Sequence, residues 1–412
     1  MILRIIDMGY PDPFGHELMY TNSVYDAAEE KGFSAIIYGS EIPIENIGRK
    51  IVPLFKDWKQ IRKNKNFPFC FIFFKIYEMY YVFKKLKSLY AEDISPDDIF
   101  LFHSPVYRHF PSILFWYRKV KHKPRLILIL RYSNLPFKTK FKWIKKEFYL
   151  KRIKQWILSF FYNNLSRYKL ILGTDSDILA EEFQQIWKMP VVSFPIPIPN
   201  QIYSLKLLNS KLNRSCIKNS SKKESLTLIS LGPARDDKGS YLLYEAIIGV
   251  LDLWKGINLQ FIIQTKTSEK GSKKTKKTIK LLSSIDPCVK TYNRELSQEE
   301  YWNIFYQADI VLLPYDADEY RARTSGIFAE AMALGKHAVI PRGTWMEKEI
   351  IGQKHKISLF DGRTSFSLID AILKSLEFES HLDQDFPPDK HWKEKHNSKS
   401  FIEVVYNASK TR

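Results

Sequence analysis

The chain has 412 residues and a formal net charge of +19, and hydrophobic residues make up 45% of it. At roughly 100–200 residues per domain, this length predicts two domains, and the composition excludes a disordered chain. The three cysteines, Cys70, Cys216 and Cys288, lie far apart and form no CxxC pair. A disulfide framework or a zinc site is therefore not expected, and a reducing cytoplasm is the expected compartment.

The first half of the sequence alternates apolar, strand-like runs with helical segments. No basic segment precedes the N-terminal run MILRIIDMGY, so this run predicts a first strand rather than a signal peptide. The predicted strands are residues 1–9, 34–39, 98–103, 125–133 and 170–176, with helices at 16–32 and 177–187. Continuous apolar strands that alternate with helices predict a doubly wound parallel sheet, and we assign it to an N-terminal domain at 1–195.

A basic and aromatic window lies within this domain, at residues 56–154. It contains 24 Lys and Arg against 7 Asp and Glu, which gives a net charge of +17. Within residues 137–161, apolar side chains recur at helical spacing and cations fall largely between them: Phe141, Ile144, Phe148, Ile153, Trp156, Ile157 and Phe160, with Lys142, Lys145, Lys146, Lys151, Arg152 and Lys154. Such a helix suits an anionic membrane surface. An ordinary surface helix that packs on its own domain explains the pattern equally well, and both interpretations stay open.

Two other partners are not favoured by this window. The apolar run at 67–83 is interrupted by Lys75 and Glu78 and falls short of the roughly 20 residues that a spanning helix needs. No nucleic-acid recognition module accompanies the positive charge, so no nucleic-acid partner is expected.

The second half repeats the α/β pattern after a proline-spaced connection at residues 191–200. A new strand is predicted at 226–232, and the lysine run at 269–280 reads as a solvated loop that leads into a helix. We assign a C-terminal domain to residues 200–394 and a last helix to about 395–412, which could pack back on the N-terminal domain. Two such domains would face each other across a cleft, and open parallel sheets bind ligands beyond the carboxyl ends of their strands.

The segment RARTSGIFAEAMALGK, residues 321–336, has the features of a phosphate-binding helix N-terminus. Thr324 or Ser325 is a good N-cap, and Gly326 permits close approach of a ligand. The amides of Gly326, Ile327 and Phe328 are expected to be free donors at the positive end of the helix dipole. Glu330 lies about one turn further in, and a carboxylate there would repel phosphate but accept hydrogen bonds from a ribose. A capped core helix with an incidental Glu330 is the alternative.

A second segment of the same domain supports the ligand-binding interpretation. The loop LGPARDDKGSYLL, residues 231–243, follows a predicted strand and carries Arg235 and Lys238. Two cations at a diphosphate would stabilise the charge that develops on a leaving group. The DAD triplet at 316–318 precedes the helix and is interpreted as turn chemistry rather than a metal site.

Together these segments resemble the GT-B glycosyltransferases, specifically the retaining group that uses nucleotide-sugar donors. The resemblance rests on FGHELMYTNSVYDAAEEKGFSAIIYG, GTDSDILAEEF, SLGPARDDKG and SGIFAEAMALGK, and it covers most of the chain. It implies an α/β fold with two Rossmann-like, doubly wound domains. The family's helix carries a first Glu eight residues before the second, whereas this chain has Ala322 there and keeps only Glu330.

The resemblance also implies roles for individual residues. His103 would lie near the donor sugar, and together with Arg235 and Lys238 it completes the expected catalytic set. Ser325, Gly326, Ile327, Phe328 and Glu330 would bind the donor. Gly15 and His16 would lie on the acceptor side. Arg131 could face the same cleft, although a structural ion pair explains it better.

The leading hypothesis is therefore transfer of a hexose from a nucleotide sugar to a saccharide with retention of configuration. The acceptor hydroxyl would attack on the face that the nucleotide leaves, so no carboxylate pair is required. No metal and no cofactor are expected. A lipid-linked acceptor in cell-surface polysaccharide synthesis, with the enzyme peripheral on the inner membrane face, would explain residues 137–161. A GT-B sugar-nucleotide epimerase and an inactive nucleotide-sugar-binding scaffold remain alternatives.

Overall fold

The computed structural model places most of the chain in two compact units. The structure describes residues 1–11, 16–43, 48–56, 58, 71–131, 160, 163, 169–187, 189–200, 202, 224–267, 271–285, 287–351, 356–381 and 390–410. One unit comprises Met1–Pro197 and Ser398–Arg412, and the other comprises Ile198–Asn397.

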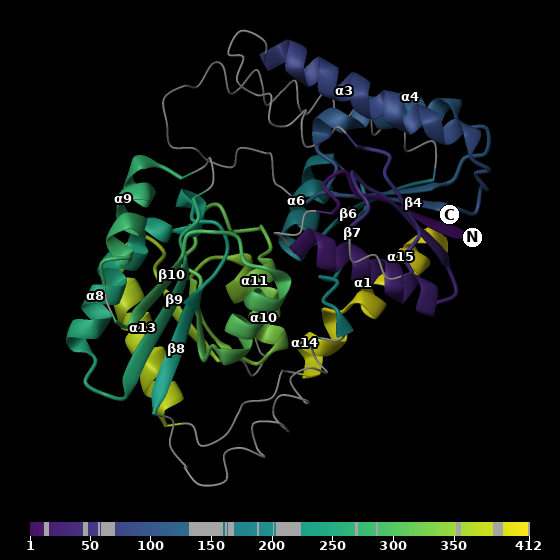
Figure 1. The fold of residues 1–412 in the computed structure, drawn as a ribbon. Helices are drawn as coiled ribbons and strands as arrows, with labels where there is room; N and C mark the ends of the chain where they lie inside the picture. The colour runs from purple at the N-terminus through teal and green to yellow at the C-terminus, as the bar shows by residue number, and fades with distance from the viewer. Residues whose placement is uncertain are drawn as a thin grey trace. The chain divides into compact units, whose positions relative to one another are not determined.

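The first unit is built on a parallel sheet, because the apolar runs of the first half pair in register (Figure 1). Its strands are β1 (Ile2–Ile6), β2 (Ser34–Tyr38), β3 (Ile51–Val52), β4 (Ile99–His103), β5 (Arg125–Ile129), β6 (Leu170–Thr174) and β7 (Val191–Ser193). The order across the sheet is β3-β2-β1-β4-β5-β6-β7. The carboxyl ends of β1, β4, β5 and β6 are therefore neighbours along one edge.

Helices cover both faces of this sheet, as Figure 1 shows. They are α1 (His16–Glu30), α3 (Phe71–Ser88), α4 (Phe110–Lys119), α6 (Asp177–Trp187) and α15 (Ser398–Lys410). Ile99 and Leu101 of β4 face the core formed with α1 and α15, while the alternate Phe100 and Phe102 contact Trp116 of α4. This two-residue alternation in a strand buried on both sides explains why the run is apolar throughout. The C-terminal helix α15 belongs to the first unit and packs against α1.

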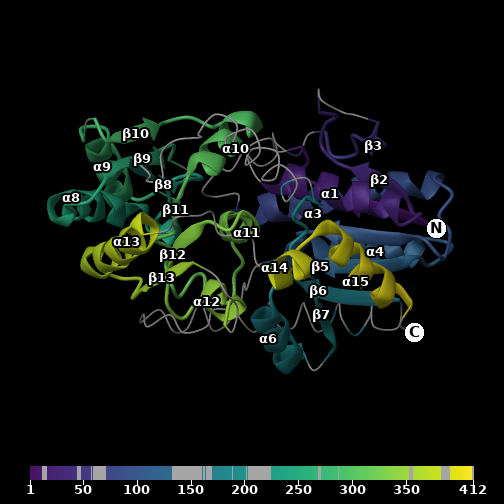
Figure 2. The ribbon, with the colours of Figure 1, turned by 90° about the horizontal axis from the view of Figure 1, so that it is seen from below.

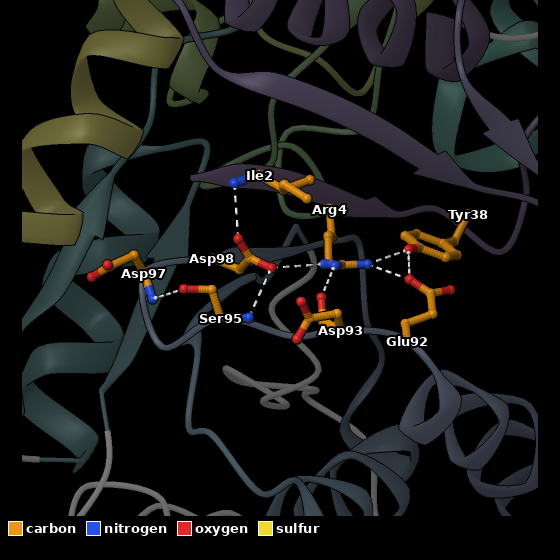
Figure 3. Close-up of polar contacts among 8 residues, drawn as sticks. All are labelled: Ile2, Arg4, Tyr38, Glu92, Asp93, Ser95, Asp97 and Asp98. Carbon is orange, nitrogen blue, oxygen red and sulfur yellow. Dashed lines mark hydrogen bonds and ion pairs between the residues drawn. The ribbon is translucent and has the colours of Figure 1, made fainter.

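A buried arginine ties β1 to the segment that leads into β4 (Figure 3). The Arg4 Nε donates to Asp98 at 3.2 Å, Nη2 donates to the Asp93 carbonyl at 3.0 Å, and Nη1 bonds the Tyr38 hydroxyl at 2.6 Å and pairs with Glu92. The side chain of Arg4 is 3% exposed. Each guanidinium nitrogen thus has an acceptor in a site shielded from water, which is the condition for burying such a charge.

The second unit repeats the architecture with a parallel sheet of order β10-β9-β8-β11-β12-β13 (Figure 2). Its strands are β8 (Ser225–Ser230), β9 (Asn258–Gln264), β10 (Val289–Tyr292), β11 (Ile310–Leu312), β12 (His337–Pro341) and β13 (Ile357–Phe360). Its helices are α8 (Leu243–Leu253), α9 (Lys273–Leu282), α10 (Gln298–Gln307), α11 (Gly326–Ala333), α12 (Trp345–Glu349), α13 (Ser365–Ser380) and α14 (Lys390–Lys395). Helices α8 and α13 pack on one face through an apolar core that includes Ile247 and Ile372.

Two sequence predictions meet the structure directly. The lysine run at 269–280 was expected to be a solvated loop before a helix, but most of it is helix α9 itself, which begins at Lys273 after the N-cap Ser272. None of the described helices combines the length and hydrophobicity needed to span a bilayer. The basic segment 137–161 lies outside the described residues apart from position 160, so neither interpretation of it is tested.

Candidate functional site

In the second unit, the N-terminus of α11 lies just beyond strand β11. Of the two predicted N-cap residues, Ser325 is the one that caps the helix, and its hydroxyl accepts from the Phe328 amide at 3.2 Å. The expectation that Phe328 offers a free amide is therefore wrong, because the cap itself uses that donor. Among the described residues no acceptor is recorded for the amides of Gly326 and Ile327, which remain the donors available to an anion.

The loop after β8 approaches this helix closely because two of its glycines permit it. Gly239 has φ +61°, and a Cβ there would lie 1.6 Å from the Pro314 carbonyl oxygen. Gly232 has φ +89°, and a Cβ there would lie 2.4 Å from the Lys238 Nζ and 3.2 Å from Ile327 Cδ1. A side chain at either position would push the loop away from β11 or α11. The Lys238 ammonium is thereby held beside the start of α11.

Three cations gather around one carboxylate at this point. Asp237 Oδ1 lies 3.0 Å from Arg235 Nε, and its Oδ2 lies 3.1 Å from Arg323 Nη1. Both arginines also contact Tyr320, since Arg235 Nη2 lies 3.4 Å from its hydroxyl and Arg323 lies over its ring at 4.8 Å. Exclusion from water and the nearby Arg235 lower the pKa of Lys238 from its ordinary value of 10.5 to about 7.

Glu330 lies inside α11, fully shielded from water. It accepts a hydrogen bond from the Tyr301 hydroxyl of α10 at 2.5 Å. The burial of the nearby Tyr306, and to a smaller extent the charge of Glu330, raises the pKa of Tyr306 to about 12. A ribose that used this carboxylate would have to reach it past the surrounding side chains, so the ribose assignment stays a prediction.

In the first unit, His103 lies at the carboxyl end of β4 in a buried polar cluster. Its Nδ1 lies 3.4 Å from the Thr21 hydroxyl and 3.6 Å from Asp7 Oδ2, and Thr21 donates to the same Asp7 oxygen at 2.8 Å. If His103 were only a structural residue at a strand end, neighbouring backbone would be its expected partner. The structure places side chains from β1 and α1 there instead.

Arg131 completes this cluster from the end of β5. Its Nη2 bonds His103 Nε2, and its Nε lies 3.8 Å from Asp175 Oδ2 beyond β6. A guanidinium can only donate, so Nε2 accepts and the proton of the neutral ring resides on Nδ1. Burial, reinforced by the Arg131 charge, lowers the pKa of His103 below its ordinary value. The structural ion pair favoured for Arg131 is present.

Other predicted residues lie outside these two clusters. Gly15 lies outside the described residues, and of His16 only its place at the start of α1 is described. Asp316 accepts from the Glu319 amide at 3.0 Å, which confirms that the DAD triplet is turn chemistry. The described part of the chain contains no cluster of His, Cys, Asp and Glu suited to a metal.

Several polar partners in these clusters were not selected from the sequence, and three of them carry charge that bears on the predicted residues. They are Asp7, Asp237 and Arg323, which pair with residues 96, 2 and 86 positions away in the chain, respectively. Asp237 lies in the same loop as Arg235 and Lys238, so its proximity to these cations could have been inferred. Nothing local marks Asp7 as a partner of His103 or Arg323 as a partner of Asp237.

No protein-family model matches the sequence, and no curated protein matches it. Several solved structures, however, share the fold of this chain over its full length. A trehalose-6-phosphate protein from E. coli bound with UDP-2-fluoro glucose has a TM-score of 0.67 at 12% identity, with 100% of both chains covered. This chain has a GT-B fold. The prediction of two Rossmann-like domains is confirmed.

Other solved structures share this fold at similar distance. A UDP-forming α,α-trehalose-phosphate synthase from Burkholderia xenovorans, in complex with glucose-6-phosphate, has a TM-score of 0.65 at 12% identity, with 100% of both chains covered. A glycosyltransferase from Rickettsia africae has a TM-score of 0.63 at 12% identity, covering 99% of this chain and 97% of that one. At this identity the likeness defines the GT-B fold and not the activity.

Proposed function

We propose that the chain is a retaining glycosyltransferase that moves a hexose from a nucleoside diphosphate sugar to a saccharide acceptor. The observation that carries the proposal is the convergence of Arg235 and Lys238 on the N-terminus of α11 in a GT-B fold. Helix amides and fixed cations form a preorganised site for a diphosphate. The similar structures point the same way, since one is bound with a UDP-sugar analogue and another is described as UDP-forming.

In this proposal the second unit binds the donor and neutralises the leaving group. The amides of Gly326 and Ile327, with Arg235 and Lys238, would hold the diphosphate while Glu330 would bind the ribose. These cations supply the charge that a divalent ion would otherwise provide, so neither a metal nor another cofactor is required. The acceptor hydroxyl would attack on the face that the nucleotide leaves, and a diphosphate oxygen would take its proton.

His103 would contribute as a positioning group on the first unit. With Arg131 donating to Nε2 and Asp7 facing Nδ1, its ring is held neutral in one orientation. Because both ring nitrogens are engaged, the imidazole is poorly suited to proton transfer, and its proposed place near the donor sugar rests on the family resemblance. The acceptor would be a sugar, and the phosphosugar bound to one similar structure is one chemical class to test.

We further propose a cytoplasmic enzyme that associates peripherally with an anionic membrane surface, where a lipid-linked saccharide would be the acceptor. Support comes from the outer surface of α3 and α4, which pack together. It exposes apolar side chains beside cations: Ile76, Tyr77, Tyr80 and Phe115, with Lys84, Lys87, Arg118 and Lys119. The one acidic residue in these two helices, Glu78, is buried and bonded to Arg108. Exposed apolar groups among cations, without exposed acids, complement anionic lipid.

The donor proposal is tested by a thermal-shift screen of the full chain against uridine, guanosine and adenosine diphosphates and their sugar conjugates. A rise in Tm with one base, followed by sugar transfer to added acceptors with retained configuration, is the expected result. Binding with sugar-nucleotide isomerisation but no transfer would favour an epimerase. Binding without turnover would favour a scaffold, and no binding at any concentration would overturn the donor site.

The membrane proposal is tested by sedimentation with phosphatidylglycerol vesicles. Replacing Lys84, Lys87, Arg118 and Lys119 with Gln should release the protein, because each cation near the surface contributes about 1 kcal/mol. The matched control replaces four exposed lysines of α9, Lys273, Lys276, Lys277 and Lys280, which should leave binding nearly unchanged. Wild-type protein that never sediments with these vesicles would remove the support for a lipid-linked acceptor.

A further inference from the structure

Arg323 belongs to the same cation cluster as Arg235 and Lys238, although nothing in the sequence selected it. It lies in the turn between β11 and α11, three residues before Gly326. Its Nη1 lies 3.1 Å from Asp237 Oδ2, on the opposite carboxylate oxygen from the one that faces Arg235 Nε at 3.0 Å. One carboxylate therefore positions two guanidinium groups, and that of Arg323 comes from 86 residues further along the chain than Asp237.

When Lys238 is protonated, the cluster holds more positive than negative charge. Arg235, Lys238 and Arg323 face two carboxylates, Asp237 and Glu330, and the charges of both arginines lower the pKa of Lys238. Glu330 is in turn engaged by the Tyr301 hydroxyl. The position where resembling proteins carry another acid is Ala322, which is buried and adds no charge. An anion bound among these cations would relieve their mutual repulsion.

Both arginines are already oriented before any ligand arrives. The Arg323 guanidinium stacks on the Tyr320 ring at 4.8 Å, and the Tyr320 hydroxyl lies 3.4 Å from Arg235 Nη2. Tyr320 is itself buried and its ring contacts that of Tyr315, with centroids 4.3 Å apart. Because their side-chain entropy is lost on folding, ligand binding would not have to order them.

We propose that Arg323 is a third cation of the donor site and binds the diphosphate together with Arg235 and Lys238. This inference rests on the proposed glycosyltransferase function and adds a residue to it. A planar guanidinium matches phosphate oxygens in a two-pronged geometry that a single ammonium does not offer. Arg323 also lies three residues before Gly326, and the amides of Gly326 and Ile327 would face the same diphosphate. In the other possible role, Arg323 would only clamp the turn before α11 to the loop after β8.

The two roles are separated by comparing a nucleoside diphosphate with its monophosphate in titration calorimetry. Both nucleotides carry the base whose diphosphate raises the Tm of the protein in the thermal-shift screen. The variant is Arg323→Gln, with Arg321→Gln, in the same turn, as the matched control and Arg323→Lys as the conservative variant. We expect Arg323→Gln to weaken diphosphate binding about tenfold or more and monophosphate binding about threefold or less, on the scale of one charge-assisted hydrogen bond. Arg323→Lys should recover part of the loss, and Arg321→Gln should change neither affinity.

Equal losses for the two nucleotides, or a fall in Tm with unchanged affinities, would overturn the proposal in favour of the clamp. Inorganic pyrophosphate serves as a second probe that does not depend on the nucleotide assignment. If wild-type protein binds pyrophosphate but no nucleotide, and Arg323→Gln loses that binding, the donor proposal fails while the anion site at Arg323 stands. If wild-type protein binds neither probe, both fail.

Discussion

Arg4 in the first unit and the part-buried Asp237 cluster in the second are both networks of cations and carboxylates, but their balance of charge is opposite. Arg4 is one cation with two carboxylates, Glu92 and Asp98, a hydroxyl and a carbonyl as acceptors (Figure 3). In the second unit, three cations share Asp237 and Glu330. In the first network carboxylates outnumber the cation, whereas in the second the basic groups outnumber the carboxylates.

The two networks also lie at opposite ends of the strands in their sheets. Arg4 bonds residues 92–98, which precede β4 and thus lie toward the amino end of that strand. The Asp237 cluster lies beyond the carboxyl ends of β8 and β11, where open parallel sheets bind ligands. A network rich in carboxylates stabilises the fold by pairing its buried cation, and one with excess basic groups beyond the strand ends can accept an anion.

The largest expected effect concerns the Arg4 network. Arg4→Met should lower the free energy of unfolding of the first unit by about 3–5 kcal/mol, because it leaves Asp98 and Glu92 without their buried cation. Denaturant unfolding followed by circular dichroism measures this loss. Arg49→Met is the control, since the Arg49–Asp26 pair is more exposed and should cost about 1 kcal/mol or less. If Arg4→Met and Arg49→Met lowered the free energy of unfolding equally, the Arg4 network would contribute no more to stability than an exposed ion pair.

The next effect concerns the carboxylate inside α11. Glu330→Ala should weaken nucleotide binding by about 1–3 kcal/mol, the scale of lost hydrogen bonds to a charged group. Calorimetry with the preferred nucleoside diphosphate measures it, and the 2′,3′-dideoxy analogue should bind wild type and variant alike. Tyr301→Phe is the control, because it removes the partner seen at 2.5 Å and leaves the carboxylate. If Tyr301→Phe and Glu330→Ala lower stability equally and leave affinity unchanged, Glu330 is structural and the ribose assignment falls.

A smaller effect is a proton taken up when the donor binds. The pKa of Lys238 is lowered to about 7, so near pH 7 to 8 a large share of this group is neutral in the free protein. A bound diphosphate favours the ammonium, raises the pKa and draws in a proton. Calorimetry in buffers of different ionisation enthalpy should give an uptake that disappears in Lys238→Met. Identical heats in all buffers would place Lys238 away from the diphosphate.

The same lowered pKa affects folding. Unfolded Lys238 holds its proton up to about pH 10.5, while the folded group releases it at about 7. The unfolded state therefore binds more protons between these values, and the Lys238 contribution to stability rises with pH across that window. Lys238→Met should flatten this part of the stability profile, while Lys255→Met, on the surface, should not.

The smallest effect concerns His103. Arg131→Met removes the donor that occupies Nε2 and the charge that disfavours the imidazolium, so the pKa of His103 should rise, with Asp7 and Asp175 still nearby. Nitrogen-15 NMR of histidine-labelled protein, assigned with His103→Gln, measures both the tautomer and the titration. Arg131→Lys keeps the charge and should shift the pKa less.

The sign of the stability change follows from the same pKa. Because folded His103 titrates below its ordinary value of 6.5, the unfolded state takes up a proton first as pH falls. Stability from this group is complete above 6.5 and declines below it, and Arg131→Met should reduce that decline. A wild-type ring protonated on Nε2 would contradict the assigned tautomer.

Much of the fold was readable from the sequence because the rules involved act over a few residues. Apolar runs such as RLILIL, in alternation with helices, predicted parallel strands. The hydroxyls of Thr324 and Ser325 ahead of an apolar run predicted the N-cap. That local rule also explains one error, since the cap consumes the Phe328 amide that a phosphate was expected to use.

By itself, the sequence determined two doubly wound sheets, a capped helix after β11 and a loop with Arg235 and Lys238. Only the tertiary structure decided which charged groups meet. Asp7 reaches His103 because β1 and β4 are neighbours in the sheet, and Arg323 reaches Asp237 because β8 lies beside β11. Strand order is set by the packing of whole sheets and helices, so these pairings depend on long-range burial that no local pattern of residues encodes.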